Sequence, residues 1–270
     1  MTKLLGVIGD PISHSMSPLI HNGWLRDLSI DATYEAMHVP AGEISSALKT
    51  LESRDIIGVN VTLPHKHDAL AACTEATKAA AKIGAANTLT FQSPGHWHAD
   101  NTDAPGFLRA LGETKGSEER VLVLGAGGSA RAIVFALTNR NIPVTIVNRT
   151  VLKAAELAAE FGASATAFGD IAQYKDYIDS ATIVVNTTSM GYGGDVLALP
   201  KGEGRTFFDI SYGKIAAPQL AHAAEQGWNT KDGLTMLVAQ AAYSFESWFG
   251  EMPSFDAALE RCQFAIRATQ

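Results

Sequence analysis

The sequence predicts an α/β fold with largely parallel strands, arranged as two α/β domains. Short apolar runs alternate with helix-like stretches along the chain, which is typical of sheets covered by helices. A Gly-rich turn also follows the apolar run Val121–Leu124 and opens a helix, so a second α/β unit begins there. A chain of 270 residues can form two domains of modest size.

The first third of the chain predicts three strands and two helices, followed by a hairpin and a further helix. The expected strands lie near Leu4–Ile8, Thr33–His38 and Gly58–Val61, and the helices begin near Pro18 and Glu43. Two more strands, Ala86–Phe91 and Trp97–Ala99, flank Ser93-Pro94-Gly95, whose Pro-Gly pair indicates a turn. We expect an antiparallel hairpin at a sheet edge there, and then a helix over Ala104–Leu111.

A polar loop, Gly112–Glu119, separates this region from the second unit. The expected strands of that unit are Val121–Leu124, Val144–Val147, Ile183–Val185 and Phe207–Ile210, with helices from the Gly-rich turn to about Asn139 and over Val151–Phe161. The spacing of apolar residues predicts two final helices, Leu234–Phe249 and Phe255–Thr269, separated by Met252-Pro253. We expect them to form a helical hairpin that packs on one of the two sheets.

The charge balance excludes a broad class of partners. With 21 Lys and Arg against 28 Asp and Glu, the formal net charge is −7, the wrong sign for general binding to nucleic acid or to an anionic membrane. The net charge does not exclude small anionic ligands that a local pocket holds. The first apolar run is too short for a signal-peptide core, and no apolar stretch approaches the length of a membrane span.

Cysteine and histidine usage favours a cytoplasmic protein without a metal. Cys73 and Cys262 are far apart and lack CxxC spacing, so neither a disulfide framework nor a zinc site is indicated. The pairs His65/His67 and His96/His98 could suggest metal ligation, but no Cys or carboxylate cluster completes a site. We therefore expect no metal, and these histidines to be polar surface or pocket residues.

The Gly-rich turn has the context of a dinucleotide-binding site. Gly125-Ala126-Gly127-Gly128-Ser129-Ala130 matches G-x-G-x-x-[G/A] between a strand and a helix. Glycines permit a tight turn and close approach of the backbone to a pyrophosphate, whose charge the helix N-terminus then meets. The alternative is a plain Gly-rich turn between a strand and a helix.

The end of the next strand indicates which dinucleotide. NAD-specific versions place an acidic residue there to bond the ribose 2′-hydroxyl, whereas this chain has Asn148, Arg149 and Thr150. The Arg149 guanidinium suits a 2′-phosphate, and Lys153 follows one helical turn later. The alternative, a solvated basic pair, places cations unfavourably near a helix N-terminus. The pattern therefore favours NADP over NAD.

Three segments of the first domain carry polar residues that a core would not need. They are Ser13–Pro18, Asn60–Lys66 and Asn101–Asp103. Asn60 and Thr62 alternate with apolar residues and so share one face of a strand, and Lys66 lies in a turn begun by Pro64. Each has a structural explanation when taken singly: Lys66 as a surface residue, and Asp103 as the N-cap of the helix that begins at Ala104.

Taken together, these segments resemble the shikimate dehydrogenase family, and the resemblance covers nearly the whole chain. The matching motifs are Ser15–Pro18, Asn60–Lys66, Gly84–Thr88, Asn101–Asp103, the GAGGSARA turn from Gly125, Asn148–Thr150, Asn186–Gly191 and Met236–Ala241. Their order and register make coincidence an unsatisfactory explanation.

The resemblance implies a substrate-binding domain and a Rossmann-type NADP-binding domain with a cleft between them. It places the substrate domain at residues 1–101, completed by the C-terminal helices at 238–270, and the NADP domain at 102–237. The implied activity is the reversible NADPH-dependent reduction of 3-dehydroshikimate to shikimate, a step towards chorismate and the aromatic amino acids. The implied partners are these two small molecules, and the protein would be a monomer or a homodimer.

The resemblance also implies roles for individual residues. Lys66 and Asp103 would be the catalytic pair. The substrate contacts would be Ser15, Ser17, Thr62, Asn87, Tyr212 and Gln240, with Asn60 nearby. The cofactor contacts would be Gly125, Ala126, Gly127, Gly128, Ser129, Ala130, Asn148, Arg149, Thr150, Lys153, Ile210 and Gly233.

Chemistry is consistent with these roles. Hydride delivery to a ketone leaves negative charge on oxygen, which needs a positioned proton donor. Lys66 can supply the proton, and Asp103 can orient the ammonium and bond a substrate hydroxyl. Hydroxyl donors, Ser15 and Ser17, can meet the substrate carboxylate.

Some positions depart from the family pattern. Ala104-Pro105-Gly106 follows Asp103 where Gly commonly follows, and an early Pro suits the first turn of a helix. Thr235 stands where a second Gly is frequent, which can alter the backbone approach to the nicotinamide. Lys78 replaces a frequent acid near the cofactor, and Tyr212 belongs to a loose match.

Two alternative functions follow from the same fold. One is an NAD-dependent quinate/shikimate dehydrogenase, which Asn148-Arg149-Thr150 argues against. The other is a non-catalytic NADP-binding regulator, which would need neither Lys66 nor Asp103.

Overall fold

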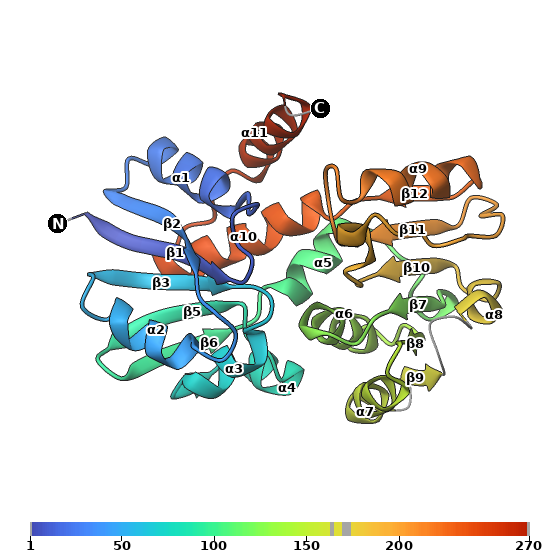
Figure 1. Cartoon of the computed structure of the whole chain (residues 1–270), viewed down its shortest axis with the longest axis horizontal. Helices are drawn as coiled ribbons and strands as arrows, with labels where there is room; N and C mark the ends of the chain where they lie inside the picture. Colours follow the sequence, from blue (N-terminus) through green and yellow to red (C-terminus); the bar gives the residue numbers. More distant parts are fainter. Residues whose placement is uncertain (1, 163–164, 169–173, 269–270) are drawn as a thin grey trace. The chain divides into compact units, whose positions relative to one another are not determined.

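The computed structural model describes residues 2–162, 165–168 and 174–268, and it consists of two compact units (Figure 1). The first unit comprises the chain up to Gly106 and from Leu237 onward, and the second comprises Phe107–Met236. Both divisions fall inside helices, α5 (Asp103–Leu111) and α10 (Leu234–Phe249). Each unit has its own six-stranded sheet, so the predicted fold class, two α/β domains, is confirmed.

The first unit contains a mixed sheet with strand order β2-β1-β3-β5-β6-β4. The strands are β1 (Lys3–Gly9), β2 (Ala32–His38), β3 (Ile56–Val61), β4 (Glu75–Ala76), β5 (Thr88–Ser93) and β6 (His96–Asp100). β1 pairs in parallel with β2 and β3, while β5 is antiparallel to β3 and β6. The predicted hairpin is therefore present, but its predicted place at the sheet edge is wrong, because β4 pairs with β6 outside it.

The helices of this unit include two that the sequence analysis missed. The helices of the unit are α1 (Ser17–Asp27), α2 (Ile44–Leu51), α3 (Lys66–Ala72), α4 (Lys78–Ile83), α11 (Phe255–Ala268) and the adjoining parts of α5 and α10. The two missed helices are α3 and α4, which have seven and six residues, too few for a clear apolar period. As a result Lys66 begins a helix, and its predicted place in a turn is wrong. Local signals do bound α4, since the Thr77 hydroxyl caps its start and Gly84 at φ 72° ends it.

The last two helices pack on the first unit in different ways. From α10, Trp248 Nε1 donates to Leu89 O in β5 at 3.2 Å, so this helix lies on the first sheet. α11 instead packs on α1, where Arg261 pairs with Asp27 at 2.6 Å. Trp24 Nε1 of α1 also donates to Ser254 O, just before α11, at 2.7 Å. The two predicted helices are present, and α10 lies on a sheet as expected, whereas α11 packs on α1 instead of forming the second arm of a hairpin on the sheet.

The second unit contains a fully parallel sheet with order β12-β11-β10-β7-β8-β9. Its strands are β7 (Val121–Leu124), β8 (Val144–Val147), β9 (Ala165–Phe168), β10 (Ile183–Asn186), β11 (Thr206–Asp209) and β12 (Asn229–Lys231). In chain order this is the 3-2-1-4-5-6 arrangement of dinucleotide-binding folds, whose ligands lie beyond the carboxyl ends of the strands where the order reverses. That reversal falls between β7 and β10.

Helices and short helical turns precede or connect these strands. They are α6 (Gly128–Thr138), α7 (Val151–Phe161), α8 (Tyr174–Ile178), α9 (Ala217–Glu225) and the 3₁₀ turns η1 (Gly116–Glu118) and η3 (Met190–Gly193). The four central strands were predicted because they are buried and therefore apolar. β12 was missed because its three residues are polar and exposed, and its pairing with β11 alone places it in the sheet. Among the described residues, no helix is long and apolar enough to cross a membrane.

A buried histidine lies in the aromatic core of the first unit. The His21 ring in α1 stacks on Tyr34 of β2, with centroids 4.2 Å apart and planes 3° apart, and Trp24 meets it edge-on at 5.4 Å. Burial lowers the pKa of His21 from 6.5 to about 3, which a contact with Asn60 opposes. The folded protein therefore holds a neutral imidazole at every pH above about 3.

This burial predicts a specific loss of stability in acid. Below pH 6.5 the unfolded chain protonates His21 while the folded chain does not, so the free energy of unfolding falls as the pH falls from about 6.5 towards 3. In urea titrations at pH 7 and pH 4, we expect His21→Phe to lose less stability than the wild type, by about 2 kcal/mol or more. His96→Phe, an exposed histidine of the same unit, is the control and should behave as the wild type. Equal acid losses in wild type and His21→Phe would contradict this account.

Candidate active site

Polar side chains gather at one edge of the first sheet because of its strand directions. β3 and β6 both run antiparallel to β5, so the ends of β3 and β6 lie at the same edge as the start of β5. Lys66 follows the end of β3, Asn87 immediately precedes β5, and Asp103 follows the end of β6. The topology thereby brings three residues from separate sequence motifs into contact.

Lys66 and Asp103 form a buried ion pair at this edge. Lys66 Nζ lies 2.5 Å from Asp103 Oδ2, and the two side chains are only 9% and 6% exposed. Each residue is the first of its helix, α3 and α5 respectively. Lys66 O also accepts from Ala86 N at 2.9 Å, which holds the start of α3 against the segment before β5. A charged donor is thus fixed beside a carboxylate that can orient it.

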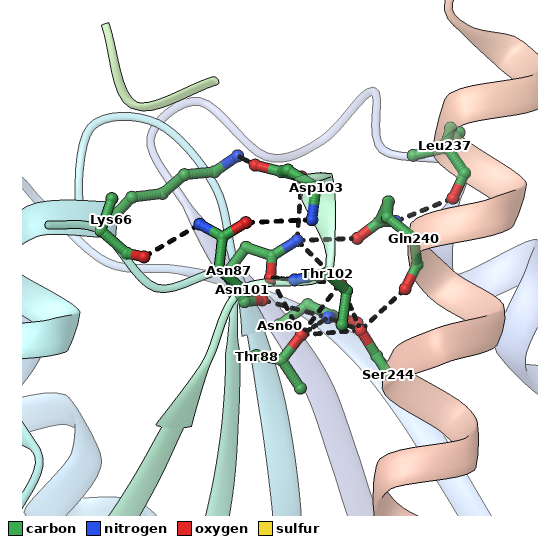
Figure 2. A network of polar contacts seen from close by, with 11 residues as sticks. Asn60, Lys66, Asn87, Thr88, Asn101, Thr102, Asp103, Leu237, Gln240 and Ser244 are labelled. Carbon is green, nitrogen blue, oxygen red and sulfur yellow. Dashed lines mark hydrogen bonds and ion pairs between the residues drawn. The ribbon is translucent and has the colours of Figure 1, made fainter. Parts of the chain in front are cut away.

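The side chain of Asn87 joins the other carboxylate oxygen to the surrounding elements (Figure 2). Asn87 Nδ2 donates to Asp103 Oδ1 at 2.9 Å, to Thr102 Oγ1 at 3.0 Å and to Gln240 Oε1 at 3.1 Å. Its Oδ1 accepts from Thr102 N at 2.8 Å, and this backbone donor fixes which way the amide points. Asn87 therefore sets the orientation of both Asp103 and Gln240.

Gln240 connects α10 with Asn87 and so with the Lys66–Asp103 pair. Its Oε1 accepts from Asn87, and its Nε2 donates to Leu237 O at 2.8 Å. One turn later, the Ser244 hydroxyl contacts Thr88 at 2.7 Å and Thr102 at 3.1 Å. A Cβ on Gly106 of α5 would approach Gln240 N to 3.0 Å, so the glycine permits the close approach of α5 and α10.

Asn60 lies beneath this group with its amide fully engaged. Its Oδ1 accepts from Tyr34 Oη at 2.7 Å, and its Nδ2 donates to Ser244 Oγ at 2.9 Å and to Asn87 O at 3.1 Å. Burial raises the pKa of Tyr34 well above its usual value, and a hydrogen bond with Ser17 opposes that rise. Tyr34 therefore remains a neutral donor, and it connects Asn60 with Ser17.

The two serines and Thr62 lie at the neighbouring strand ends. Ser17 N donates to Ser15 Oγ at 3.3 Å at the start of α1, where Ser17 is buried and Ser15 is half-buried. Thr62 follows β3, and its backbone N donates to Ile8 O of β1 at 2.9 Å. β1 and β3 are parallel neighbours, so these residues share the edge with Lys66. All the residues expected to contact the substrate in the first unit lie at this edge.

Four residues of this network escaped the sequence analysis as site residues: Tyr34, Thr88, Thr102 and Ser244. Thr88 and Thr102 lie inside motifs that were quoted for the resemblance, next to Asn87 and Asp103. Ser244 is four residues after Gln240, on the same face of α10. That spacing was the available signal for Ser244, whereas nothing local distinguishes Tyr34 from a core tyrosine.

The Gly-rich turn of the second unit has the geometry of a phosphate cradle. Gly125 follows β7 with φ 109°, and a Cβ there would collide with the Thr187 hydroxyl. A Cβ on Gly127 would meet no atom within 4 Å, and α6 begins at Gly128, directly after it. Ser129 and Ala130 lie in the first turn of α6. The turn therefore has the open space that a pyrophosphate needs, beside a helix N-terminus that favours an anion.

The residues expected at a ribose 2′-phosphate follow β8 in the same sheet. Asn148 Nδ2 donates to Thr150 O at 2.9 Å, which fixes the bend before α7. Arg149 and Lys153 are exposed at the start of α7. An exposed Arg and Lys at a helix start suit an anion better than they suit the helix dipole.

Ile210 and Gly233 are in close backbone contact at the carboxyl edge of this sheet. A Cβ on Gly233 would collide with Ile210 O, so only glycine fits there. Gly233 N donates to Ser211 O at 2.8 Å. Tyr212 follows in the same loop and is half-buried. Ile210, Tyr212 and Gly233, predicted separately, are thus assembled by two neighbouring loops.

The positions that depart from the family pattern have simple placements. Pro105 lies in the first turn of α5, which proline tolerates. Lys78 is the exposed first residue of α4. Thr235 lies at the start of α10 and lines a cavity of about 370 Å³ with Leu220, Lys231 and Asp232. Among the described residues, no group of three or more His, Cys, Asp or Glu is arranged to hold a metal ion.

The two sites and the strand orders define a class of protein: a two-domain α/β oxidoreductase fold with a dinucleotide-binding sheet. Three family models match the chain. They are the shikimate dehydrogenase substrate binding domain over residues 7–89, shikimate / quinate 5-dehydrogenase over 109–193, and the shikimate 5'-dehydrogenase C-terminal domain over 233–263.

Individual relatives match over the full length. The shikimate dehydrogenase (NADP(+)) of Hyphomonas neptunium is 49% identical over 271 residues, covering 100% of both chains. The crystal structure of shikimate dehydrogenase from Aquifex aeolicus has a TM-score of 0.88 at 32% identity, covering 97% of both chains. The Thermus thermophilus enzyme in complex with NADP(H) and shikimate has a TM-score of 0.81 at 34% identity, covering 97% of this chain and 99% of that one. The chain belongs to the shikimate dehydrogenase family.

Proposed function

We propose that this protein catalyses the reversible NADPH-dependent reduction of 3-dehydroshikimate to shikimate, a step towards chorismate and the aromatic amino acids. The observation that carries the proposal is the buried pair of Lys66 and Asp103, 2.5 Å apart, beside the amide of Asn87. Membership of the shikimate dehydrogenase family over the whole chain supports it. In this proposal the first unit binds the substrate and the second binds NADPH.

The buried pair suits the chemistry of ketone reduction. NADPH supplies a hydride to the carbonyl carbon, and the carbonyl oxygen then needs a proton. Lys66 is placed to donate that proton, because its Nζ is a buried cationic donor held by Asp103. In the reverse direction the neutral amine accepts the hydroxyl proton as hydride leaves the carbon. Asp103 orients Nζ throughout and can accept a hydrogen bond from a substrate hydroxyl.

The surrounding polar groups suit a polyhydroxylated carboxylate. Ser15, Ser17 and Thr62 offer hydroxyl donors for the carboxylate, while Asn87 and Gln240 offer partners for ring hydroxyls. Asn60 lies behind Asn87 and donates to its backbone carbonyl, which supports this set. A site built from short neutral donors distinguishes substrates by the arrangement of their hydroxyl groups, because an unmatched buried donor is costly.

The second unit suits NADPH. The residues that would hold the pyrophosphate are Gly125–Ala130, where the open space beside Gly127 can admit it. Asn148, Arg149, Thr150 and Lys153 would hold the adenosine 2′-phosphate, and Ile210 and Gly233 would contact the nicotinamide end. The preference for NADPH over NADH rests on the guanidinium of Arg149 in place of a carboxylate.

We further propose that the protein acts in the cytoplasm as a monomer or homodimer, with no nucleic-acid or membrane partner. Cys73 and Cys262 are free thiols, which suits a reducing compartment. The formal net charge of −7 is unfavourable for binding polyanions.

The direct test is turnover with pairs of substrates and cofactors. We expect the purified protein to oxidise NADPH in the presence of 3-dehydroshikimate, and to do so far faster than NADH. In the reverse direction, shikimate should be oxidised by NADP⁺ in preference to quinate. Absence of turnover with either cofactor would reject the enzyme in favour of a binding-only protein. Preference for NAD⁺ and quinate would favour the alternative dehydrogenase.

Lys66 should act on kcat and only slightly on KM. We expect Lys66→Ala to lower kcat by about two orders of magnitude or more, because the proton donor is lost. Lys66→Arg keeps a cation beside Asp103, but a guanidinium does not give up its proton, so it should also be slow while folding normally. Steady-state kinetics and thermal unfolding measure both effects. Lys49→Ala, an exposed lysine of α2, is the control, and unchanged kcat in Lys66→Arg would remove Lys66 from proton transfer.

Gly127 and Gly125 should respond differently to the same substitution. Gly127→Ala leaves the fold intact, because its backbone has φ −86° and no atom lies within 4 Å of the new Cβ. Its Kd for NADPH should nevertheless rise about tenfold or more, because the methyl group enters the space that the pyrophosphate needs. Gly125→Ala should lower Tm, since φ is 109° and Thr187 is in the way. NADPH fluorescence titration and thermal unfolding measure both, and an unchanged Kd in Gly127→Ala would place the phosphates elsewhere.

A further inference from the structure

Two buried side chains at the carboxyl edge of the second sheet form a pair that no role above uses. Asn186 is the last residue of β10 and Asp209 is the last residue of β11, and the two are register partners in adjacent strands. Asn186 Nδ2 donates to Asp209 Oδ2 at 2.8 Å, and the residues are only 3% and 2% exposed. A charged carboxylate is thus bonded to an amide beneath the surface.

Each member of the pair also fixes the loop that follows its own strand. Asp209 Oδ1 accepts from Ser211 N at 2.9 Å and from Ser211 Oγ at 2.5 Å. Asn186 Oδ1 accepts from Thr188 N at 3.1 Å and from Thr188 Oγ1 at 2.7 Å. These are the local turns that Asn and Asp side chains form with backbone two residues ahead. The single bond between Asn186 and Asp209 therefore couples two turns.

Both turns continue into the residues expected to hold the cofactor. Ser211 O accepts from Gly233 N at 2.8 Å, and Ile210, between Asp209 and Ser211, packs directly on Gly233. On the other side, Thr187 Oγ1 donates to Leu124 O at 2.7 Å and lies against Gly125. A chain of contacts thus joins the end of β7 to the end of β12 through Asn186 and Asp209.

We propose that Asn186 and Asp209 are positioning residues for NADPH, which hold the phosphate-binding turn and the Ile210–Gly233 contact in one fixed arrangement. The pair acts through the loops, and its effect falls on cofactor affinity rather than on substrate affinity. This inference rests on the proposed assignment of the second unit to NADPH. It goes beyond that assignment by naming the two residues that set the shape of the site.

The hydrogen bonds of the pair can be tested by exchanging its members. In the double variant Asn186→Asp/Asp209→Asn, the new carboxylate can accept from Thr188 and the new amide, and the new amide oxygen can accept from Ser211. Every bond keeps a donor and an acceptor, and the net charge is unchanged. Asn186→Asp alone sets two carboxylates against each other. Asp209→Asn alone leaves one amide oxygen to serve both Asn186 Nδ2 and Ser211, so an NH2 group faces one of these donors.

We expect each single variant to raise the Kd for NADPH about tenfold or more in fluorescence titrations, and the double variant to recover to within about threefold of the wild type. The KM for 3-dehydroshikimate at saturating NADPH should change little. Asp179→Asn makes the same chemical change at an exposed position of the second unit and should bind as the wild type does. Ser211→Ala, which removes one hydroxyl and leaves the pair in place, should raise Kd by a few fold and covers the case in which a single variant fails to fold.

Three results would overturn the proposal. They are single variants that lower Tm but bind NADPH normally, a folded double variant that binds no better than the singles, and an unchanged Kd in Ser211→Ala. Because binding is measured without turnover, failure of the proposed reaction leaves this test intact. A wild-type protein that turns over substrate while Asn186→Asp keeps its affinity would reject the pair alone.

Discussion

The carboxylate of Asp103 is the constraint on which the first unit's site depends. A buried charge is tolerated only when its polar atoms are fully satisfied. One oxygen of Asp103 is taken by Lys66 and the other by Asn87. Each partner arrives on a different element, and each must be held in place by further contacts. Burial of the Asp103 carboxylate therefore requires fixed positions for the starts of α3, β5 and α5.

The amide of Asn87 extends that constraint into the sheet. Thr102 N donates to its oxygen and so sets the orientation of the amide. Gln240 must then accept from the Asn87 NH2 group, and Thr88 must donate to the Asn87 oxygen. Beneath it, Asn60 joins Tyr34 to Ser244. Networks of this kind strengthen one another in a low-dielectric interior, and a missing member leaves the rest unsatisfied. The polar groups of this site therefore hold one another in place.

The second unit meets its proposed ligand by a different means. Its expected donors are backbone N–H groups and exposed cations. Its shape depends on three positions without a side chain, Gly125, Gly127 and Gly233. Asn186 and Asp209 bond to each other and fix the loops that follow β10 and β11. An acidic chain can thus accommodate anionic ligands, because a few donors and cations at strand ends decide local affinity while net charge acts at longer range.

Much of this could be predicted from the sequence, because the signals are local. Short, mainly apolar runs of three or four residues predicted β7, β8, β10 and β11. The Gly-rich turn with Asn148-Arg149-Thr150 predicted a phosphate cradle and its cofactor. The motifs around Lys66, Asn87, Asp103 and Gln240 predicted which residues meet in the first unit. Short elements escaped, because α3 and α4 are too brief for periodicity, and the exposed strands β4 and β12 belong to their sheets only through pairing.

By itself, then, the sequence determined the class of fold, the family and the residue types of the two sites. The tertiary structure alone decided the arrangement: that β4 rather than the hairpin forms the sheet edge, that Tyr34 and Ser244 support Asn60, and that Asn186 bonds Asp209. The physical reason is distance along the chain. Turn and helix signals act over a few residues, whereas the bonds of Asn60 join positions 26 and 184 residues apart, and only the folded sheet brings such partners within hydrogen-bond reach.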